Sequence, residues 1–316
     1  MDGVQTALLQ LGRRLRAAGY HFITPTPETH RRVLARPYDA ADASLSDIFG
    51  WNRPFSASAL PADLAELLRA ADCMESYTDE RLRSAVRFST LGRQLFVHSA
   101  FPTDAADAVF FGPDTYRFVR AVTEISRSDP GFVPETVVDI GAGTGAGGLS
   151  CSTLYPQASI ILSDINRSAL RFAEINARLD DMHNVQLVES DVLAGIMGTV
   201  DLVIANPPYL VDPGRRTYRH GGGTWGCDLA KRIVDESLPR LGPQGKLLLY
   251  TGTPVVRGID KFLDAVWPIL ERHTRSYRYE EIDPDVFGEE LSNSPYDGAD
   301  RIAVVMLLVD AKDLRR

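Results

Sequence analysis

The feature that most constrains the fold is a glycine-rich loop set between a strand and a helix. Residues 136–140, Thr-Val-Val-Asp-Ile, form a short apolar run typical of a buried strand. The loop that follows carries Gly141, Gly143 and Gly145, and glycine lets a backbone turn sharply and approach a ligand closely. A strand, a glycine loop and a helix in this order predict one unit of a parallel sheet that binds a nucleotide-like ligand.

Strands and helices alternate from this point to the end of the chain. The predicted strands cover residues 136–140, 159–164, 185–189, 200–205, 246–250, 276–282 and 301–309, and the clearest helices cover 167–179 and 259–270. No helix separates the last two strands, so we expect them to pair antiparallel. The pattern predicts an α/β fold with a doubly wound sheet of seven strands, the last of them antiparallel.

Residues 1–87 are predicted to form a separate helical domain that recognises the substrate. Apolar residues from Leu8 to Leu15 recur at spacings of three and four, which places them on one face of a helix. A second helix is expected to open at Pro61, because proline favours the first turn of a helix. Thr78, followed by two acidic residues, is expected to cap a third helix.

The rest of the chain is predicted to form two further parts. Residues 88–130 are expected to form a β-hairpin with its turn at Gly92, and then a connecting helix that ends near Ser126. Residues 131–316 are expected to form the ligand-binding domain. A chain of 316 residues is long enough for two domains of ordinary size.

Composition and charge narrow the class of protein. The amino terminus lacks the apolar run of a signal peptide, and no stretch reaches the length of a membrane span, so we expect a cytoplasmic protein without a membrane partner. The three cysteines form no CxxC pair, and no metal site is expected. The net charge of −8 argues against long nucleic acid as a partner.

An acidic residue follows the glycine loop at an informative distance. Asp164 ends the second predicted strand, 164 − 145 = 19 residues after Gly145. A carboxylate in this position can accept hydrogen bonds from both ribose hydroxyls of a nucleoside. The loop and the acid therefore predict a nucleoside-containing ligand, and they fit a dinucleotide and S-adenosylmethionine equally well.

A short motif after the fourth predicted strand separates these two ligands. Asn206, Pro207, Pro208 and Tyr209 follow the strand at the edge where ligands bind. The prolines lack amide donors, so the motif is rich in acceptors that suit a planar NH2 group, and Tyr209 is expected to offer a stacking face. The alternative is an Asx turn that closes the strand, with Tyr209 as a cover over the core.

At these residues the chain resembles class I S-adenosylmethionine-dependent methyltransferases with an Asn-Pro-Pro-Tyr motif. It is most similar to the release-factor glutamine N5-methyltransferases, roughly over residues 88–316. The resemblance implies that S-adenosylmethionine is the cofactor and that Asn206, Pro207 and Tyr209 are the catalytic residues. It implies cofactor contacts from these residues: Asp139, Gly141, Gly143, Gly145, Asp164, Asp191 at the adenine end, and Asn206.

The motif leaves several acceptors open. It occurs in enzymes that methylate glutamine N5 and in enzymes that methylate adenine N6, so a protein glutamine is the first hypothesis and adenine is another. A small-molecule amine or guanidine such as free arginine is a further alternative. A cofactor-binding scaffold without activity is the non-enzyme alternative. The sequence leaves the acceptor and the oligomeric state undetermined.

Two charged segments outside the motif also need an interpretation. The loop Arg215–Gly226 is either a mobile lid or a tight crossing with solvated arginines. His220 within it is either a base or a solvated or capping residue. Residues 280–290 are acidic and link the last two strands. If this link faces the site, it favours a cationic substrate; otherwise it is a solvated loop.

Overall fold

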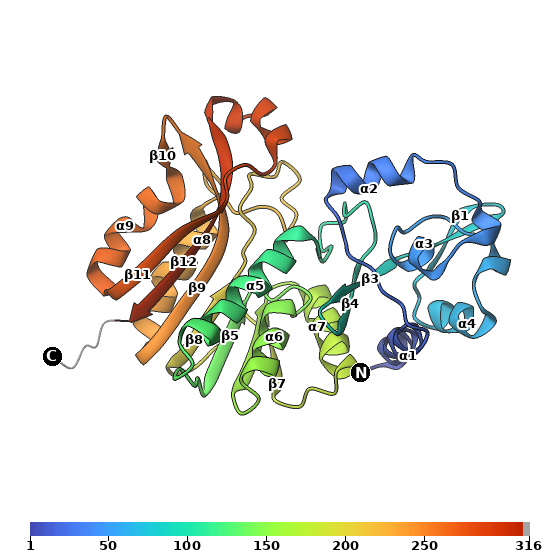
Figure 1. Ribbon diagram of the computed structural model, residues 1–316, viewed down its shortest axis with the longest axis horizontal. Helices are drawn as coiled ribbons and strands as arrows, with labels where there is room; N and C mark the ends of the chain where they lie inside the picture. The colour runs from blue at the N-terminus through green and yellow to red at the C-terminus, as the bar shows by residue number, and fades with distance from the viewer. Residues whose placement is uncertain (312–316) are drawn as a thin grey trace.

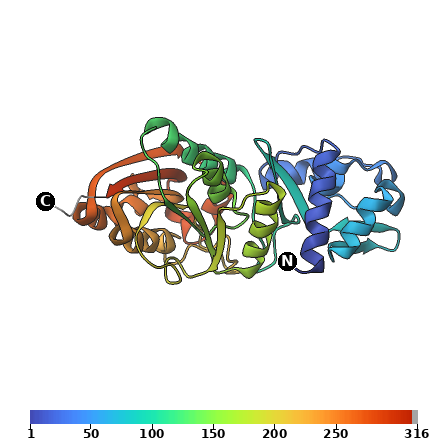
Figure 2. The ribbon, with the colours of Figure 1, turned by 90° about the horizontal axis from the view of Figure 1, so that it is seen from below.

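The protein, in a computed structural model, is described from residue 1 to residue 311 and consists of two bodies side by side (Figure 1). The N-terminal body contains α1 (Gly3–Ala17), α2 (Pro27–Leu34), α3 (Leu45–Phe49), α4 (Ala62–Ala70), β1 (Met74–Thr78), β2 (Arg81–Ser84), β3 (Val86–Leu91) and β4 (Gln94–Ser99). Two short 3-10 helices, Ala40–Asp42 and Ala57–Ala59, and loops connect its helices. Seen from below, α1 lies at the junction with the second body (Figure 2).

Of the three helices predicted in this body, two form, as α1 and α4. The buried residues Leu8, Leu11 and Leu15 line one face of α1. The expected helix after Thr78 is wrong, because residues 74–84 form the antiparallel hairpin β1–β2 instead. Asp79 and the residue after it make the turn of this hairpin rather than a first helical turn. The N-terminal body is therefore helical with an added hairpin.

A second hairpin joins the two bodies. Strands β3 and β4 pair antiparallel around a turn at Gly92, whose φ of +61° explains the glycine. The hairpin starts at Val86, so the predicted boundary between residues 87 and 88 lies inside β3. Asn176 of the second body holds the hairpin through bonds to the amide and carbonyl of Val97, at 2.8 and 3.2 Å.

The second body is a single twisted sheet with helices on both faces. After α5 (Pro113–Ser128) it contains β5 (Thr136–Ile140), α6 (Ala146–Leu154), β6 (Ser159–Asp164), α7 (Arg167–Leu179), β7 (Val185–Glu189), β8 (Val200–Ala205), α8 (Asp228–Ser237), β9 (Leu241–Val256), β10 (Ile259–Asp260), α9 (Lys261–His273), β11 (Thr274–Asp283) and β12 (Arg301–Ala311). The strand order is β11-β12-β9-β8-β5-β6-β7, and the two-residue β10 pairs with β9.

The register confirms the predicted topology. Strands β5 to β9 pair parallel, whereas β12 lies antiparallel between β9 and β11. Helices α5, α6 and α7 cover one face of the sheet and α8 and α9 cover the other, each over its own apolar core. Because β11 runs in the direction of β9, the link after β11 leaves the sheet at the same edge as the loops after β5, β6 and β8.

No helix among residues 1–311 is long and apolar enough to cross a membrane.

Candidate active site

The glycine loop after β5 is shaped by its backbone. Gly141, Gly143 and Gly145 have φ angles of +67°, +56° and +81°, which side chains other than glycine rarely adopt. The amides of Gly141 and Ala142 both donate to the Ser163 carbonyl, at 2.8 and 3.0 Å, so the loop is fixed against β6. A Cβ added at Gly141 would meet no atom within 4 Å, so the loop is open on its outer side.

Asp164 lies directly beside this loop. One carboxylate oxygen accepts from the Gly143 amide at 2.9 Å and the other from the Asn166 amide at 2.8 Å. The side chain is 9% exposed, and burial raises its pKa even though these backbone bonds lower it. A third backbone hydrogen bond, from Ile165, also lowers the pKa of this carboxylate. Because a carboxylate has about four acceptor sites, Asp164 keeps capacity to accept from a ribose hydroxyl.

Asp139 has a different environment from Asp164. It is 2% exposed, and its carboxylate accepts from the amide of Gly148, at 2.7 Å, in the first turn of α6. Burial raises the pKa of Asp139 to about 7. In this structure Asp139 holds the helix that follows the loop, and a contact with the cofactor remains a prediction.

Asp191 follows β7 at the same edge of the sheet. Its side chain is 60% exposed and forms an ion pair with Arg232 of α8 at 2.8 Å. Its predicted contact with the adenine end of the cofactor is not tested by this arrangement. A ligand at this position would share the carboxylate with Arg232.

The Asn-Pro-Pro-Tyr motif begins where β8 ends. The Asn206 side chain is half-buried and forms no hydrogen bond with any other side chain or backbone group of residues 1–311. Tyr209 is 7% exposed, and its hydroxyl donates to Asp114 at 2.6 Å. A Cβ at Gly252 would lie 2.1 Å from the Tyr209 ring. The Phe287 ring packs edge-on against the Tyr209 ring, with the two ring centroids 5.9 Å apart. The ring of Tyr209 is therefore packed by these two neighbours rather than open for stacking, and a catalytic role for Tyr209 stays a prediction.

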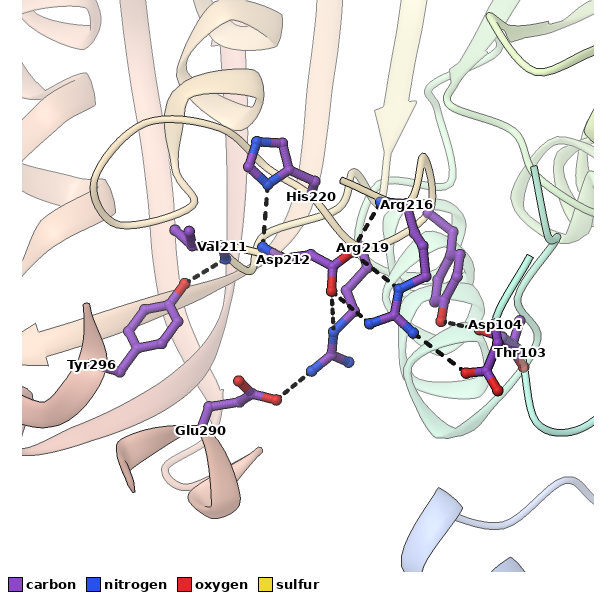
Figure 3. A network of polar contacts seen from close by, with 10 residues as sticks. Thr103, Asp104, Val211, Asp212, Arg216, Arg219, His220, Glu290 and Tyr296 are labelled. Atoms are coloured by element: carbon purple, nitrogen blue, oxygen red, sulfur yellow. Dashed lines mark hydrogen bonds and ion pairs between the residues drawn. The ribbon is translucent and has the colours of Figure 1, made fainter. Parts of the chain in front are cut away.

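Residues 212–220, which follow the motif, are fixed by ion pairs (Figure 3). Asp212 is 2% exposed, and it accepts from Arg216 through the backbone amide at 2.9 Å and through the guanidinium at 3.0 and 2.5 Å. Arg219 approaches the same carboxylate at 3.6 Å and also pairs with Glu290. These contacts lower the pKa of Asp212 to about 2.

Of the two interpretations of the loop Arg215–Gly226, a mobile lid or a tight crossing, the contacts favour the tight crossing. Arg216 and Arg219 are paired rather than solvated, whereas Arg215 is exposed. His220 is a capping residue in this structure, because its Nδ1 accepts from the Asp212 amide at 3.2 Å.

A short segment, residues 103–107, lies between the turn after β6 and the loop after the Asn-Pro-Pro-Tyr motif, and contacts both. The carbonyl of Thr103 accepts from the Tyr218 hydroxyl at 2.6 Å, and Asp104 lies 3.6 Å from Arg216. Asp107 accepts from Asn166 through its carbonyl and from Ser168 through its carboxylate, both at 2.8 Å. The segment thus contacts the turn after β6 and the loop after the motif.

The acidic link lies beside the motif, and several of its carboxylates are paired with arginines of this chain. Asp283 pairs with Arg117 at 2.8 Å, and Glu281 pairs with Arg301 at 2.7 Å. Glu290 is occupied by Arg219, as described above. The hypothesis that this link attracts a cationic substrate is weakened, because paired carboxylates present less net negative charge.

Sequence reasoning missed the partners of the motif. Asp114, Asp212 and Phe287 contact the motif or the loop after it, yet no local pattern marks them as site residues. Asp114 carries a partial signal, since it stands in the Gly-Pro-Asp-Thr bend that opens α5. Phe287 contacts Tyr209, which lies far away in the sequence. Asp212, in contrast, pairs with Arg216 and Arg219 of its own loop.

The open side of the glycine loop, the remaining acceptor capacity of Asp164 and the acceptor-rich motif fit S-adenosylmethionine. Together with the sheet order and the antiparallel β12, they define a class I S-adenosylmethionine-dependent methyltransferase. Residues 127–256 match the family model of the methyltransferase small domain. The chain is an S-adenosylmethionine-dependent N-methyltransferase, and S-adenosylmethionine is its cofactor.

The chain belongs to the release factor glutamine methyltransferase family. It is 30% identical over 253 residues to the release factor glutamine methyltransferase of Deinococcus radiodurans, covering 77% of this chain and 83% of that protein. It is 30% identical over 277 residues to that of Moorella thermoacetica, covering 83% and 94%. A shorter match, 31% over 128 residues, is to the ribosomal protein uL3 glutamine methyltransferase of Neisseria gonorrhoeae, covering 36% and 42%.

Proposed function

We propose that this chain methylates the side-chain nitrogen of a glutamine in a protein, and that the protein is a release factor. The observation that carries the proposal is the half-buried Asn206 side chain, which has acceptor capacity to spare beside the glycine loop. The relatives from Deinococcus radiodurans and Moorella thermoacetica support the choice of release factor, because both are named for that substrate. We place the reaction in the cytoplasm, where translation proteins act.

The proposed chemistry uses acceptors in fixed positions. The Asn206 side-chain oxygen and the Pro207 carbonyl accept the two N–H groups of the glutamine carboxamide, which orients the nitrogen. When bound, S-adenosylmethionine supplies an electrophilic methyl group. The nitrogen would form a bond to this methyl group as the methyl–sulfur bond breaks and S-adenosylhomocysteine leaves, and it would release one proton to solvent. The two acceptors would stabilise the positive charge that develops on the nitrogen. Most of the rate enhancement then comes from positioning.

The charges around the motif favour a neutral acceptor over an amine or guanidine. The carboxylates nearest to the motif are already held by Arg117 and Arg219. A cationic acceptor would have to compete with these arginines. Adenine in a long nucleic acid is disfavoured by the net charge of −8.

The test is transfer of labelled methyl groups to a panel of acceptors by the full chain. The panel holds a release factor, a ribosomal uL3 protein, free arginine and adenine-containing RNA. The expected result is label on the release factor, which disappears when the labelled glutamine is replaced by glutamate. Preferred labelling of uL3, arginine or RNA would contradict the proposed substrate.

A further inference from the structure

One buried carboxylate lies behind the motif and accepts from three side chains. Asp114, the second residue of α5, is 9% exposed. One of its oxygens accepts from the Tyr209 hydroxyl at 2.6 Å. The other accepts from the Tyr250 hydroxyl at 3.1 Å and from Arg117 at 3.2 Å. A single side chain therefore ties the motif to β9 and to α5.

The two phenols cannot easily find other partners. Tyr250 is fully buried in β9, the strand next to β8, and Tyr209 is packed between Gly252 and Phe287. Burial, reinforced by the charge of Asp114, raises the pKa of both tyrosines, so both remain protonated donors. A carboxylate can accept from both at once, whereas an asparagine has only one acceptor oxygen.

The same carboxylate connects the motif to the acidic link. Arg117, which pairs with Asp114, also pairs with Asp283 at 2.8 Å. Tyr209 is thus the end of a chain of contacts that runs from the end of β11 through α5. Hydrogen bonds to a charged acceptor are about twice as strong as neutral ones, so this chain can hold the motif against small displacements.

We propose that Asp114 is a positioning residue for methyl transfer. By holding the Tyr209 hydroxyl, it fixes the backbone of residues 206–209 and therefore the two acceptors that orient the nitrogen. The proposal rests on the role proposed for Asn206, but not on which protein carries the glutamine. A displacement of about 1 Å can cost on the order of 100-fold in rate, so the effect falls on the chemical step.

The kinetic test compares Asp114→Asn, Tyr209→Phe and the double variant in the full chain. We expect Asp114→Asn to lower kcat by about 10–100-fold while the KM for the protein acceptor and the Kd for S-adenosylmethionine stay within about threefold. The double variant should be no slower than the slower single variant, because both changes break one contact. Asp114→Glu, which restores the charge, should recover part of kcat.

A matched control lies on the same helix. Glu124 pairs with Arg127 at 2.8 Å, with the same three-residue spacing as Asp114 and Arg117, but on an exposed surface. Glu124→Gln should leave kcat within about twofold, since exposed pairs contribute little.

A second measurement does not need the acceptor. Hydrogen exchange of the Leu210 and Val211 amides reports on the backbone just after the motif, where they donate to the Arg219 carbonyl and the Tyr296 hydroxyl. Asp114→Asn should speed this exchange by about tenfold or more, and Glu124→Gln should not. If the wild type failed to label any release factor, the proposed function would fall, and this measurement would still decide the role of Asp114.

Three results would overturn the proposal. The first is unchanged kcat in Asp114→Asn, or unchanged exchange at Leu210 and Val211. The second is a double variant whose losses multiply. The third is a loss of kcat that matches the loss of folded protein in a thermal melt, which would make Asp114 a residue for stability alone.

Discussion

At the edge of the sheet where β5, β6 and β8 end, the half that holds the cofactor and the half that holds the Asn-Pro-Pro-Tyr motif are built in different ways. In the cofactor half, the loop after β5 and the acid after β6 are held by backbone amides nearby in the sequence: Asp139 and Asp164 bind amides 9 and 21 residues away. In the acceptor half, side chains bind side chains across 95 residues for Tyr209 and Asp114, and 71 for Arg219 and Glu290. One half is a local βα unit, and the other is assembled from distant segments.

This difference separates binding from selectivity. A local unit can bind the same cofactor in many proteins, so we expect the distant segments to determine which acceptor is methylated. Changes in the cofactor half should act on cofactor affinity. Changes in the acceptor half should act on turnover or on the acceptor.

The largest effect is expected at the motif itself. Asn206→Ala should lower turnover by about 100–1000-fold, since it removes an acceptor that acts on the charge developing at the nitrogen. Cofactor affinity should stay within a few-fold. Steady-state kinetics together with calorimetric titration of S-adenosylmethionine measure both. Near wild-type turnover in this variant would remove Asn206 from the mechanism.

The next effect is expected in the cofactor half. Asp164→Ala should weaken S-adenosylmethionine binding by roughly 1.5–3 kcal/mol, or about 10–150-fold, because ribose hydroxyls lose a charged acceptor. The matched control is Asp201→Ala. Asp201 also accepts from two backbone amides, those of Glu135 and Thr136, both at 3.0 Å, but at the opposite edge of the sheet. Equal loss of cofactor affinity in the two variants would argue against a direct contact from Asp164.

A third prediction concerns the buried carboxyl below the glycine loop. The pKa of Asp139 is raised from 3.8 to about 7 by burial, so the folded state favours the protonated form. The stabilisation that this pKa shift contributes is fully present below pH 3.8, and it is lost as the pH rises through about 7. The Asp139→Asn side chain is neutral at every pH. The free energy of unfolding of this variant, relative to wild type, should therefore rise by about 2 kcal/mol from pH 5.5 to pH 7.5.

The measurement is urea unfolding of both proteins at the two pH values, without cofactor. A stability difference that does not change with pH would mean that Asp139 has an ordinary pKa.

The smallest effect is expected in the loop after the motif. Asp212→Asn removes the charge that holds Arg216 and Arg219, so the loop should loosen and the KM for the protein acceptor should rise by about 3–10-fold. Asp310→Asn breaks a pair with Lys246 at the far edge of the sheet and serves as the control. Cofactor affinity should not change in either variant. A rise in KM with Asp310→Asn as well would point to a general loss of stability.

The parts of the molecule that sequence could predict are those with local causes. The glycine loop and the place of Asp164 follow from residue type and spacing, and the antiparallel last strand follows from the lack of a helix before it. The turn at Gly92 follows from the ease with which glycine adopts a positive φ. The hairpin β1–β2 was missed because Thr78 and the acids after it suit a helix cap and a turn alike. The Tyr209 ring is covered by Gly252 and Phe287, its hydroxyl is held by Asp114, and Arg219 pairs with Glu290. The sequence places all of these partners far away, so it could not predict these contacts.

The most direct test of the proposed function is to locate the transferred methyl group. A release factor incubated with S-adenosylmethionine and the full chain would be analysed by tandem mass spectrometry, with Asn206→Ala in parallel. The expected result is a single methyl group on the side-chain nitrogen of a glutamine with the wild type, and very little with Asn206→Ala. A methyl group on another residue type, or equal methylation by Asn206→Ala, would contradict the proposed function.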